Sequence, residues 1–387
     1  MQLRRCAVAW LEPREVAEFA LEGLLAGRTG ISRSMRWFAH APHLPAPVEL
    51  DAPAAMLLGA IGPSQWRDAD ELVRAHGDVV AVLRDAGLLV ADGDRGDDDA
   101  TYRAQHWHGL AALWHAGSRW SGVDSAGEVS EAGLDTAEGL RSAHGAPPPA
   151  CIARGDLDDA IRLPRAETEA FDELLDARTT CRNFDTTRAL PLVDCARLLE
   201  RVFAVRGEIR AADDFDVVKK TSPSGGALHP TEAYLIVQRV EGLAPGLYHY
   251  RADAHALQPM GQVDDLAAFA RTAVAGQDWF SDAHVLVVLA PRYARNFWKY
   301  RRHPKAYRVA ILDVGHLSQT LLLSATEMGL GAYVTAAINE IDIERAFGLT
   351  GIVDGPLAIC GFGLRAETIT TSEFALSDLR SAARRHP

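Results

Sequence analysis

The sequence predicts a globular chain of mixed helix and strand that is divided into two domains by a proline-rich linker. Three observations predict this organisation. Apolar residues recur at helical spacing in the first part of the chain, short apolar runs rich in β-branched residues follow residue 230, and three consecutive prolines stand between the two regions. We therefore expect domains at residues 1–141 and 151–387, joined by an extended linker at 142–150.

Composition limits the class of protein. The chain has 387 residues, of which 48% are hydrophobic, so it can bury a large core. Its net charge of −12 disfavours nucleic acid or an anionic membrane as the main partner. No apolar run has the length of a membrane span, and the N-terminal one is too short for a signal peptide. The five cysteines show neither a C-x-x-C pair nor metal-ligand spacing. We expect a soluble cytoplasmic protein with reduced thiols and no metal site.

The first domain is predicted to contain three short helices followed by a strand. The helices are expected at Ala54–Ile61, Asp68–Ala75 and Asp78–Ala86, and the strand at Gly87–Val90. This order resembles a winged helix. Residues 1–100 carry 16 acidic against 10 basic residues, which disfavours contacts to nucleic-acid phosphates. A peptide-binding or purely structural role is therefore expected.

The second domain is predicted to combine helices, single strands and one hairpin. Amphipathic spacing predicts helices at 167–177, 191–203 and 310–328. Apolar β-branched runs predict strands at 233–240, 283–290 and 356–360, and a hairpin at 246–260.

The longest of these helices carries two stripes. Its apolar stripe is formed by Ile311, Val314, Leu317, Leu321 and Leu322. On another side, polar residues recur at three- and four-residue steps, namely Asp313, His316 and Thr320, with Gln319 at the edge. By itself, this polar strip is typical of a solvent-facing surface.

The segment Thr221–Tyr234 carries glycine, proline and hydroxyl groups directly before an apolar strand. Gly225 and Gly226 permit backbone angles that are closed to other residues, and Pro223 and Pro230 stiffen the flanks. A ligand-binding loop and a tight turn into a strand both explain these residues, and the segment alone favours neither.

The segment Arg178–Phe184 is a candidate phosphate-binding element. Arg178 and Arg182 lie four residues apart with Thr179 and Thr180 between them. In a helical turn, both guanidiniums would face one phosphate. By spacing alone, solvated arginines on a surface turn are the better interpretation.

The segment Arg292–Arg308 gathers basic and aromatic residues in an otherwise acidic chain. Neighbouring positive charges would favour the neutral form of Lys299, which could then accept a proton, and Tyr300 could donate or shuttle one. A solvated basic loop or a docking patch for an acidic peptide explains the same composition.

Gly361–Ala366 matches G-x-G-x-x-A, but the 21 residues after it are too few for the βαβ unit of a dinucleotide site.

Six motifs, taken in order, resemble the flavin-dependent nitroreductase superfamily. They are RTTCRNF, SPSGGALHPTEAY, GLYHY, WKYRRHPKAYR, DVGHLSQTLLL and GLGAYV. More narrowly, they look like the SagB/ThcOx-type dehydrogenases, which oxidise azoline rings in ribosomally made natural products. The resemblance implies an α+β fold with a central, mostly antiparallel sheet flanked by helices. It also implies a homodimer with one flavin mononucleotide (FMN) at each of two subunit interfaces.

The resemblance further implies site residues. It assigns cofactor binding to Arg178, Thr179, Thr180, Arg182, Pro223, Ser224, Gly225, Gly226, Gln319, Ala336, Ala337 and Arg365. The first four match the family's RRSxRxF phosphate element, in which Thr179 replaces an arginine and Thr180 a serine. Thr320 replaces the family's asparagine after Gln319. Lys299 and Tyr300 match the catalytic Lys-Tyr pair of azoline-oxidising relatives, although Arg301 follows where they have glycine.

The implied function is FMN-dependent dehydrogenation of a thiazoline or oxazoline ring in a modified precursor peptide, with a cyclodehydratase as a partner. Such oxidation needs a base for the proton on carbon and an acceptor for the hydride. Two alternatives stay open. One is an NAD(P)H-dependent reductase of nitro, quinone or dehydroamino acid groups, and the other is a non-catalytic peptide-binding scaffold with a flavoprotein fold.

Overall fold

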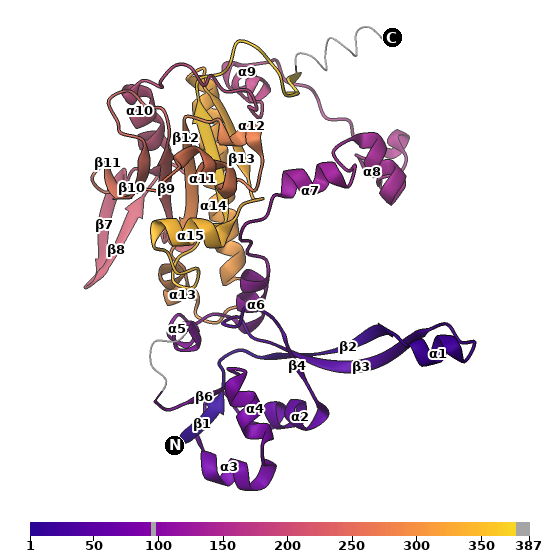
Figure 1. Cartoon of the computed structure of the whole chain (residues 1–387). Coiled ribbons are helices and arrows are strands. Elements are labelled where there is room, and N and C mark those ends of the chain that lie inside the picture. Colours follow the sequence, from indigo (N-terminus) through magenta and orange to yellow (C-terminus); the bar gives the residue numbers. More distant parts are fainter. Residues whose placement is uncertain (94–97, 377–387) are drawn as a thin grey trace. The chain divides into compact units, whose positions relative to one another are not determined.

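The computed structural model describes residues 1–93 and 98–376, which form two compact units. The first unit comprises Met1–Arg119 and Tyr293–Arg308, and the second comprises Trp120–Arg292 and the residues from Val309 onward (Figure 1). The expected linker at 142–150 thus lies inside the second unit. The division into domains at 1–141 and 151–387 stays a prediction.

One part of the first unit consists of a small antiparallel sheet and three helices. Its elements are β1 (Gln2–Arg5), β5 (Arg67–Asp68), β6 (Leu89–Ala91), α2 (Ala52–Ala60), α3 (Ala69–His76) and α4 (Val79–Asp85). β1 is the central strand. The carboxylates of Asp51 and Asp68 accept backbone amides of the first turns of α2 and α3, which fixes where both helices begin. The three predicted helices and the strand are present, whereas the winged-helix interpretation stays a prediction.

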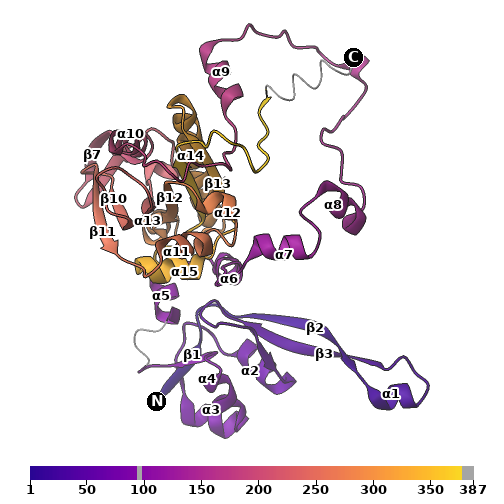
Figure 2. The same ribbon diagram turned by 45° about the horizontal axis from the view of Figure 1, so that its top comes forward.

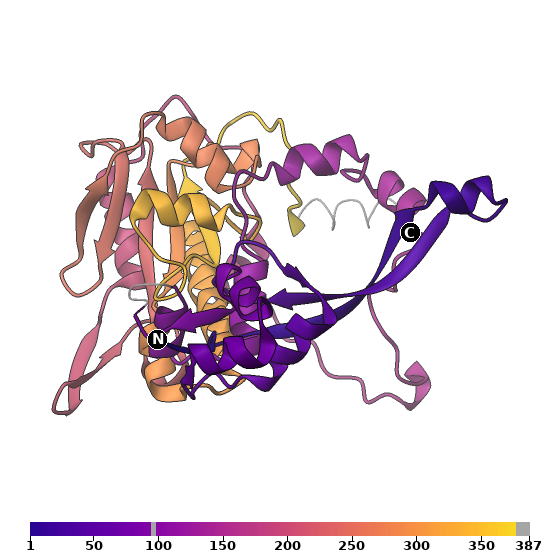
Figure 3. The ribbon, with the colours of Figure 1, turned by 60° about the horizontal axis from the view of Figure 1, so that its bottom comes forward.

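A long antiparallel hairpin is inserted between β1 and α2. β2 (Trp10–Phe19) pairs over its whole length with β3 (Ile31–His40), and α1 (Leu21–Leu25) lies at the tip (Figure 3). β4 (Val48–Leu50) pairs with the last residues of β3. The sequence did not predict this hairpin, because Pro13 within β2 argues against a strand. β2 is an edge strand, where a missing amide donor is tolerated.

The rest of the first unit surrounds an aromatic cluster. Its helices are α5 (Asp98–Ala104), α6 (Gly109–Gly117) and α13 (Tyr293–Tyr300). The ring centroid of Trp107 lies 4.7 Å from that of Phe297 and 4.8 Å from that of Tyr293. The Nδ1 atom of buried His115 lies 2.9 Å from the Tyr307 hydroxyl. This packing explains why Tyr293–Arg308 groups with the N-terminal part of the chain.

The second unit is built on a six-stranded sheet in which every neighbouring pair is antiparallel, in the order β11-β10-β9-β12-β14-β13 (Figure 1). The strands are β9 (Thr231–Val237), β10 (Gly246–Arg251), β11 (Ala256–Gly261), β12 (Val285–Pro291), β13 (Gly331–Thr335) and β14 (Ala358–Gly363). The predicted strands and the hairpin are confirmed, and β13 adds one that the sequence did not predict. The α+β fold with a central antiparallel sheet is therefore confirmed.

Helices cover both faces of this sheet (Figure 2). The helices on one face are α10 (Leu192–Phe203) and α14 (Ala306–Glu327), and those on the other face are α11 (Leu266–Ala273), α12 (Asp278–Ser281) and α15 (Glu340–Phe347). Alternate strand residues therefore enter two different cores, and all seven residues of β12 are buried. The remaining elements are α7 (Ser125–Glu131), α8 (Ala137–His144), α9 (Ala170–Ala177), the hairpin β7 (Gly207–Ala212) and β8 (Phe215–Lys219), and 3-10 turns at Leu157–Asp159 and Gly225–Ala227.

α14 is a core helix although its 22 residues have the length and apolar composition of a membrane span. Four of the five residues of the predicted apolar stripe are buried in the core, and Ile311 alone is 37% exposed. The solvent-facing polar strip is a wrong prediction for Asp313, which is only 3% exposed. The reason is that a loop packs over this part of the helix, as described below.

Three glycines let buried side chains pack directly against the backbone. A Cβ atom on Gly361 would lie 2.1 Å from the Tyr333 ring, one on Gly363 would lie 2.2 Å from the His284 ring, and one on Gly331 would lie 2.4 Å from the Cys181 sulfur. The glycines of the G-x-G-x-x-A match thus lie within an antiparallel strand, which agrees with the rejection of a dinucleotide site.

We predict that Gly361→Ala destabilises the second unit. Tyr333 cannot move away easily, because it is fully buried and stacks on Phe280 with ring centroids 3.9 Å apart. Overpacking of this kind costs about 1–3 kcal/mol or more. Urea unfolding measures the change. Gly207→Ala is the control, since a Cβ there meets nothing within 4 Å. Equal stability of the two variants would show that the core adjusts to the methyl group.

We also predict that acid weakens the fold through His284. The ring is buried, its Nε2 lies 3.0 Å from the Arg188 carbonyl oxygen, and its Nδ1 has no hydrogen-bond partner among residues 1–93 and 98–376. Burial, followed by the charge of Arg239, lowers the pKa of His284 from 6.5 to about 4. The unfolded chain therefore binds a proton at pH 4–6.5 that the folded chain does not. Stability falls as pH drops through this window, by roughly 3 kcal/mol in all.

The check is urea unfolding of the wild type and of His284→Gln between pH 7 and pH 4. The variant is expected to lose this part of the pH dependence, because glutamine does not titrate. If the two pH profiles keep the same slope, another group is responsible.

Candidate functional site

The loop at residues 221–230 is fixed on α14 by one buried carboxylate. Asp313 Oδ1 accepts the Gly225 amide at 3.0 Å, and Oδ2 accepts the Ser224 hydroxyl at 2.5 Å. The Ser224 oxygen in turn accepts the His229 amide at 2.9 Å. The hydroxyls of Ser222 and Thr320 lie 2.7 Å apart. The loop is therefore attached to the polar side of α14 at two points, Asp313 and Thr320, which lie about two helical turns apart.

The backbone of this loop adopts conformations that are costly for most residues. Gly226 has a φ of 65°, Ala227 has 58° and His229 has 43°. Glycine accepts such angles freely, whereas a residue with a Cβ loses about 1–2 kcal/mol. Strain of this kind persists only where surrounding contacts impose it, and it is concentrated at functional sites.

A cavity of about 490 Å³ lies between this loop and the β7–β8 hairpin. Its volume is within the usual range of small-molecule sites. The loop contributes Ser222, Pro223, Ser224, Ala227 and His229. The hairpin contributes Gly207, Glu208, Ile209, Val217, Val218 and Lys219. The cavity thus combines apolar side chains with hydroxyl and imidazole groups.

The predicted residues of the loop have different places in it. Pro223 and Ser224 line the cavity, Gly225 gives its amide to Asp313, and Gly226 provides one of the positive φ angles. Burial raises the pKa of Asp313, while the hydrogen bonds from Ser224 and Gly225 act in the opposite direction.

A second group of donors converges on the carboxylate of Glu373, which is only 6% exposed. Oε1 accepts the backbone amides of Arg182 at 2.6 Å and Asn183 at 3.0 Å, and also the Asn183 side-chain amide at 2.8 Å. Oε2 forms an ion pair with the Arg365 guanidinium. Two of the residues predicted for cofactor binding, Arg182 and Arg365, therefore take part in an anion-binding group.

The segment 178–184 is extended, so the helical turn that would let both guanidiniums face one phosphate is not formed. Thr180 forms a bridge to Ala332 beside β13, and the Cys181 amide donates to the Ala332 carbonyl at 2.9 Å. The two-residue period of an extended chain then puts Arg178, Thr180 and Arg182 on one side and their neighbours on the other. Arg178 itself caps the end of α9, and the Thr179 hydroxyl donates to the Phe374 carbonyl at 3.0 Å.

The strand register puts the two groups at opposite ends of the sheet. Thr231, which directly follows the loop, pairs with Pro291 at one end. At the other end, Val285 pairs with Val237 and with Phe362, three residues before Arg365. The seven residues of β12 span roughly 20 Å between the two ends. Within one chain, the loop cavity and the anion-binding group are therefore separate.

The other predicted cofactor residues join neither group in the contacts of the described residues. Gln319 and Ala336 are exposed. Ala337 donates its amide to the Thr335 hydroxyl at 3.2 Å, and its carbonyl accepts from Gln277 at 2.9 Å.

The predicted catalytic pair ends α13 in the first unit. Lys299 is exposed, and its Nζ lies 5.8 Å from the centroid of the half-buried Tyr300 ring. The next residue, Arg301, has a φ of 47°, and its guanidinium lies 2.7 Å from His106 Nε2.

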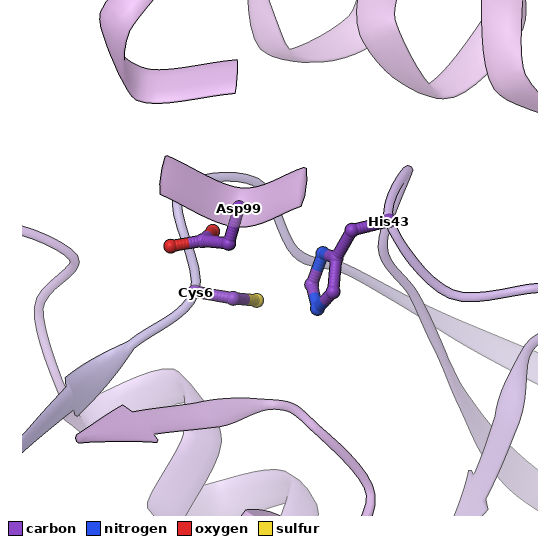
Figure 4. Close-up of side chains that lie close together, drawn as sticks. All are labelled: Cys6, His43 and Asp99. Carbon is purple, nitrogen blue, oxygen red and sulfur yellow. The ribbon is translucent and has the colours of Figure 1, made fainter. Parts of the chain in front are cut away.

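A third cluster, in the first unit, brings together Cys6, His43 and Asp99 (Figure 4). Their potential ligand atoms lie within 4.8 Å of one another, which the sequence did not predict because the residues are far apart along the chain. Asp99 already accepts the Ala7 amide and pairs with Arg103 at 2.7 Å. Burial, followed by the charge of Asp99, raises the pKa of Cys6 to about 12. We assign no metal to this cluster, because its carboxylate is already paired with a guanidinium.

Sequence reasoning missed three functional candidates. It treated Asp313 as part of a solvated strip, and it gave no role to Asn183 or Glu373. The signal for Asn183 was a polar residue beside the buried Cys181 and Phe184. No local signal marks Glu373, because its donors come from segments that are distant in sequence.

Comparison with known proteins gives a family match for the segment that contains the loop cavity and the Arg182 and Asn183 part of the anion-binding group. Residues 175–364 match the model of the nitroreductase family. The chain is 26% identical over 212 residues to the Methanocaldococcus jannaschii protein MJ1384, which is named as a nitroreductase; the match covers 54% of this chain and 97% of the relative. It is 25% identical over 185 residues to the Escherichia coli microcin B17-processing protein McbC, which covers 47% of this chain and 65% of that relative.

Among solved structures, a chain of the E. coli microcin synthetase McbBCD complex with truncated pro-MccB17 bound is similar to this chain. The match has a TM-score of 0.48 and 19% identity, and it covers 70% of this chain and 95% of the other. The six motifs, the antiparallel sheet with helices on both faces and the match of residues 175–364 agree. Residues 175–364 therefore form a domain of the nitroreductase family.

Proposed function

We propose that this protein is an FMN-dependent oxidoreductase that dehydrogenates azoline rings in a ribosomally made precursor peptide. Nitroreductase-family enzymes are oxidoreductases, and the similarity to McbC, a peptide-processing protein, supports a peptide as the substrate. The observation that carries the proposal is the strained loop at 221–230, which borders a cavity of about 490 Å³ inside the family domain.

The residues present fit FMN. The ring system requires a partly apolar cavity with backbone close by, and the loop and the β7–β8 hairpin provide both. The phosphate requires amide and guanidinium donors, and those of Arg182, Asn183 and Arg365 already hold a carboxylate, which stands in for an anionic oxygen pair. Bound FMN would supply a two-electron acceptor.

A complete site in this proposal requires two copies of the chain. The cavity and the anion-binding group lie at opposite ends of the sheet, and no residue belongs to both. In a two-fold dimer, the loop end of one copy meets the anion-binding end of the other, and this arrangement occurs twice. The homodimer implied by the sequence motifs would thus assemble two equal sites.

Lys299 and Tyr300 are proposed to handle the proton that leaves the ring carbon. A base within reach of that proton accelerates its removal, typically by two to four orders of magnitude. The support for these two residues is the Lys-Tyr motif in the sequence.

The proposed partners are the modified precursor peptide and a cyclodehydratase that forms the azoline. A cytoplasmic location is part of the proposal, with the five free thiols in support.

The direct test is incubation of the FMN-loaded protein with an azoline-containing peptide. We expect the peptide to lose two hydrogen atoms, as measured by mass spectrometry. Lys299→Ala is expected to keep its FMN and to lose turnover by about 100-fold or more. Lys305→Ala, another exposed lysine of the basic segment, is the matched control. If Lys299→Ala turns over like the control, Lys299 is not the base.

A reductase is the second candidate, because the match to MJ1384 covers 97% of that nitroreductase. The same preparation distinguishes the two. Rapid bleaching of the flavin by NAD(P)H, with no oxidation of the peptide, identifies a reductase. Colourless protein that takes up no FMN but binds the peptide identifies a scaffold.

Mixing two defective variants tests whether the site is shared between copies. Asp313→Asn removes the carboxylate that anchors the loop, and Arg365→Gln removes the guanidinium at the other end of the sheet. Each variant alone is expected to bind FMN weakly. After subunit exchange, half of the dimers are mixed and each has one intact site, so about a quarter of the wild-type FMN capacity should return. Flavin fluorescence during titration measures this capacity. A site within one chain predicts no recovery on mixing.

A further inference from the structure

The anion-binding group is closed by the chain's own C-terminal segment. Glu373 receives three N–H groups from Arg182 and Asn183 and an ion pair from Arg365. Charge-assisted contacts of this kind are the strongest hydrogen bonds in proteins. The Glu373 carboxylate is only 6% exposed and is contacted by four donors that converge on it. It therefore occupies the anion-binding group as a bound anionic ligand would.

The segment that carries Glu373 is attached by polar contacts. Asn183 Oδ1 accepts the amides of Thr370 and Thr371, each at 2.8 Å, and the Thr179 hydroxyl donates to the Phe374 carbonyl. Apolar packing contributes little to the attachment of this segment, since the side chains of Ile369 and Phe374 are 67% and 76% exposed. Segments with little apolar burial open at a low free-energy cost.

We propose that Glu373 is an internal competitor for a phosphate monoester, and that this ligand binds only when the segment 370–374 is released. The inference rests on the proposed function in taking the phosphate of FMN as the ligand. A carboxylate and a phosphate cannot share the same donors, because two anions a few ångströms apart repel each other strongly. The dianion has the greater charge and three acceptor oxygens, so it can displace the carboxylate. FMN binding and docking of this segment are therefore mutually exclusive.

Competition lowers the apparent affinity for FMN, because only the open fraction of the protein binds it. The effect depends on the phosphate, so riboflavin, which lacks one, is not subject to it. This difference separates competition from a general effect of the segment on the fold.

The first test compares FMN and riboflavin binding by flavin fluorescence in the full chain. Glu373→Gln removes the charge that pairs with Arg365. We expect it to bind FMN roughly tenfold more tightly, given the strength of contacts to charged groups, and to bind riboflavin like the wild type. Glu367→Gln is the matched control, with the same loss of charge on an exposed residue six positions earlier. If Glu373→Gln binds FMN no more tightly than the control, the proposal is wrong.

The second test needs no variant. Hydrogen exchange at the Thr370 and Thr371 amides is measured in the wild type with inorganic phosphate and with chloride at equal ionic strength. We expect phosphate alone to accelerate exchange, because it displaces Glu373 and releases the segment. Unchanged protection in phosphate overturns the proposal.

The two tests separate this inference from the function on which it rests. If phosphate releases the segment while neither flavin binds, the competition stands and the flavin function fails. If FMN binds equally well to the wild type and to Glu373→Gln, and phosphate leaves the amides protected, the flavin function stands and the competition fails.

Discussion

One buried carboxylate, that of Asp313, determines the shape of the loop at 221–230. It accepts the Ser224 hydroxyl and the Gly225 amide, and the Ser224 oxygen accepts the His229 amide. These contacts keep Gly226, Ala227 and His229 in conformations with positive φ that a free loop would leave. The position of Asp313 depends in turn on α14, whose apolar residues pack against the central sheet. Hydrophobic burial on one side of α14 thus fixes the position of the Asp313 carboxylate on another side of the same helix.

The antiparallel sheet separates the two groups of donors. The loop precedes β9 and lies at one end, whereas Arg365 follows β14 and lies at the other end. A chain with a net charge of −12 must gather its cationic and amide donors locally to bind an anion, and it does so at Arg182, Asn183 and Arg365. In the proposed competition, Glu373 occupies these donors as long as no phosphate is bound.

Much of the second unit was predictable because its residues carry strong local signals. The apolar runs that became β9 and β12 and the period of α14 define elements by themselves. Local patterns failed where a contact from elsewhere in the chain decides. Asp313 looks solvent-facing at helical spacing, and only the loop above it makes it buried. The segment 178–184 could form a turn by composition, but its pairing with Ala332 makes it extended.

The sequence by itself determined the periodic elements, the positions of the loop glycines and the order of motifs that indicates the nitroreductase family, because these depend on residues close together in the chain. Only the tertiary structure decided which groups meet. The pairing of Glu373 with Arg365 and Asn183, the burial of Asp313 and the placing of the loop and the anion donors at opposite ends of the sheet all follow from strand register and side-chain packing. These are contacts between segments far apart in sequence, and no local pattern records them.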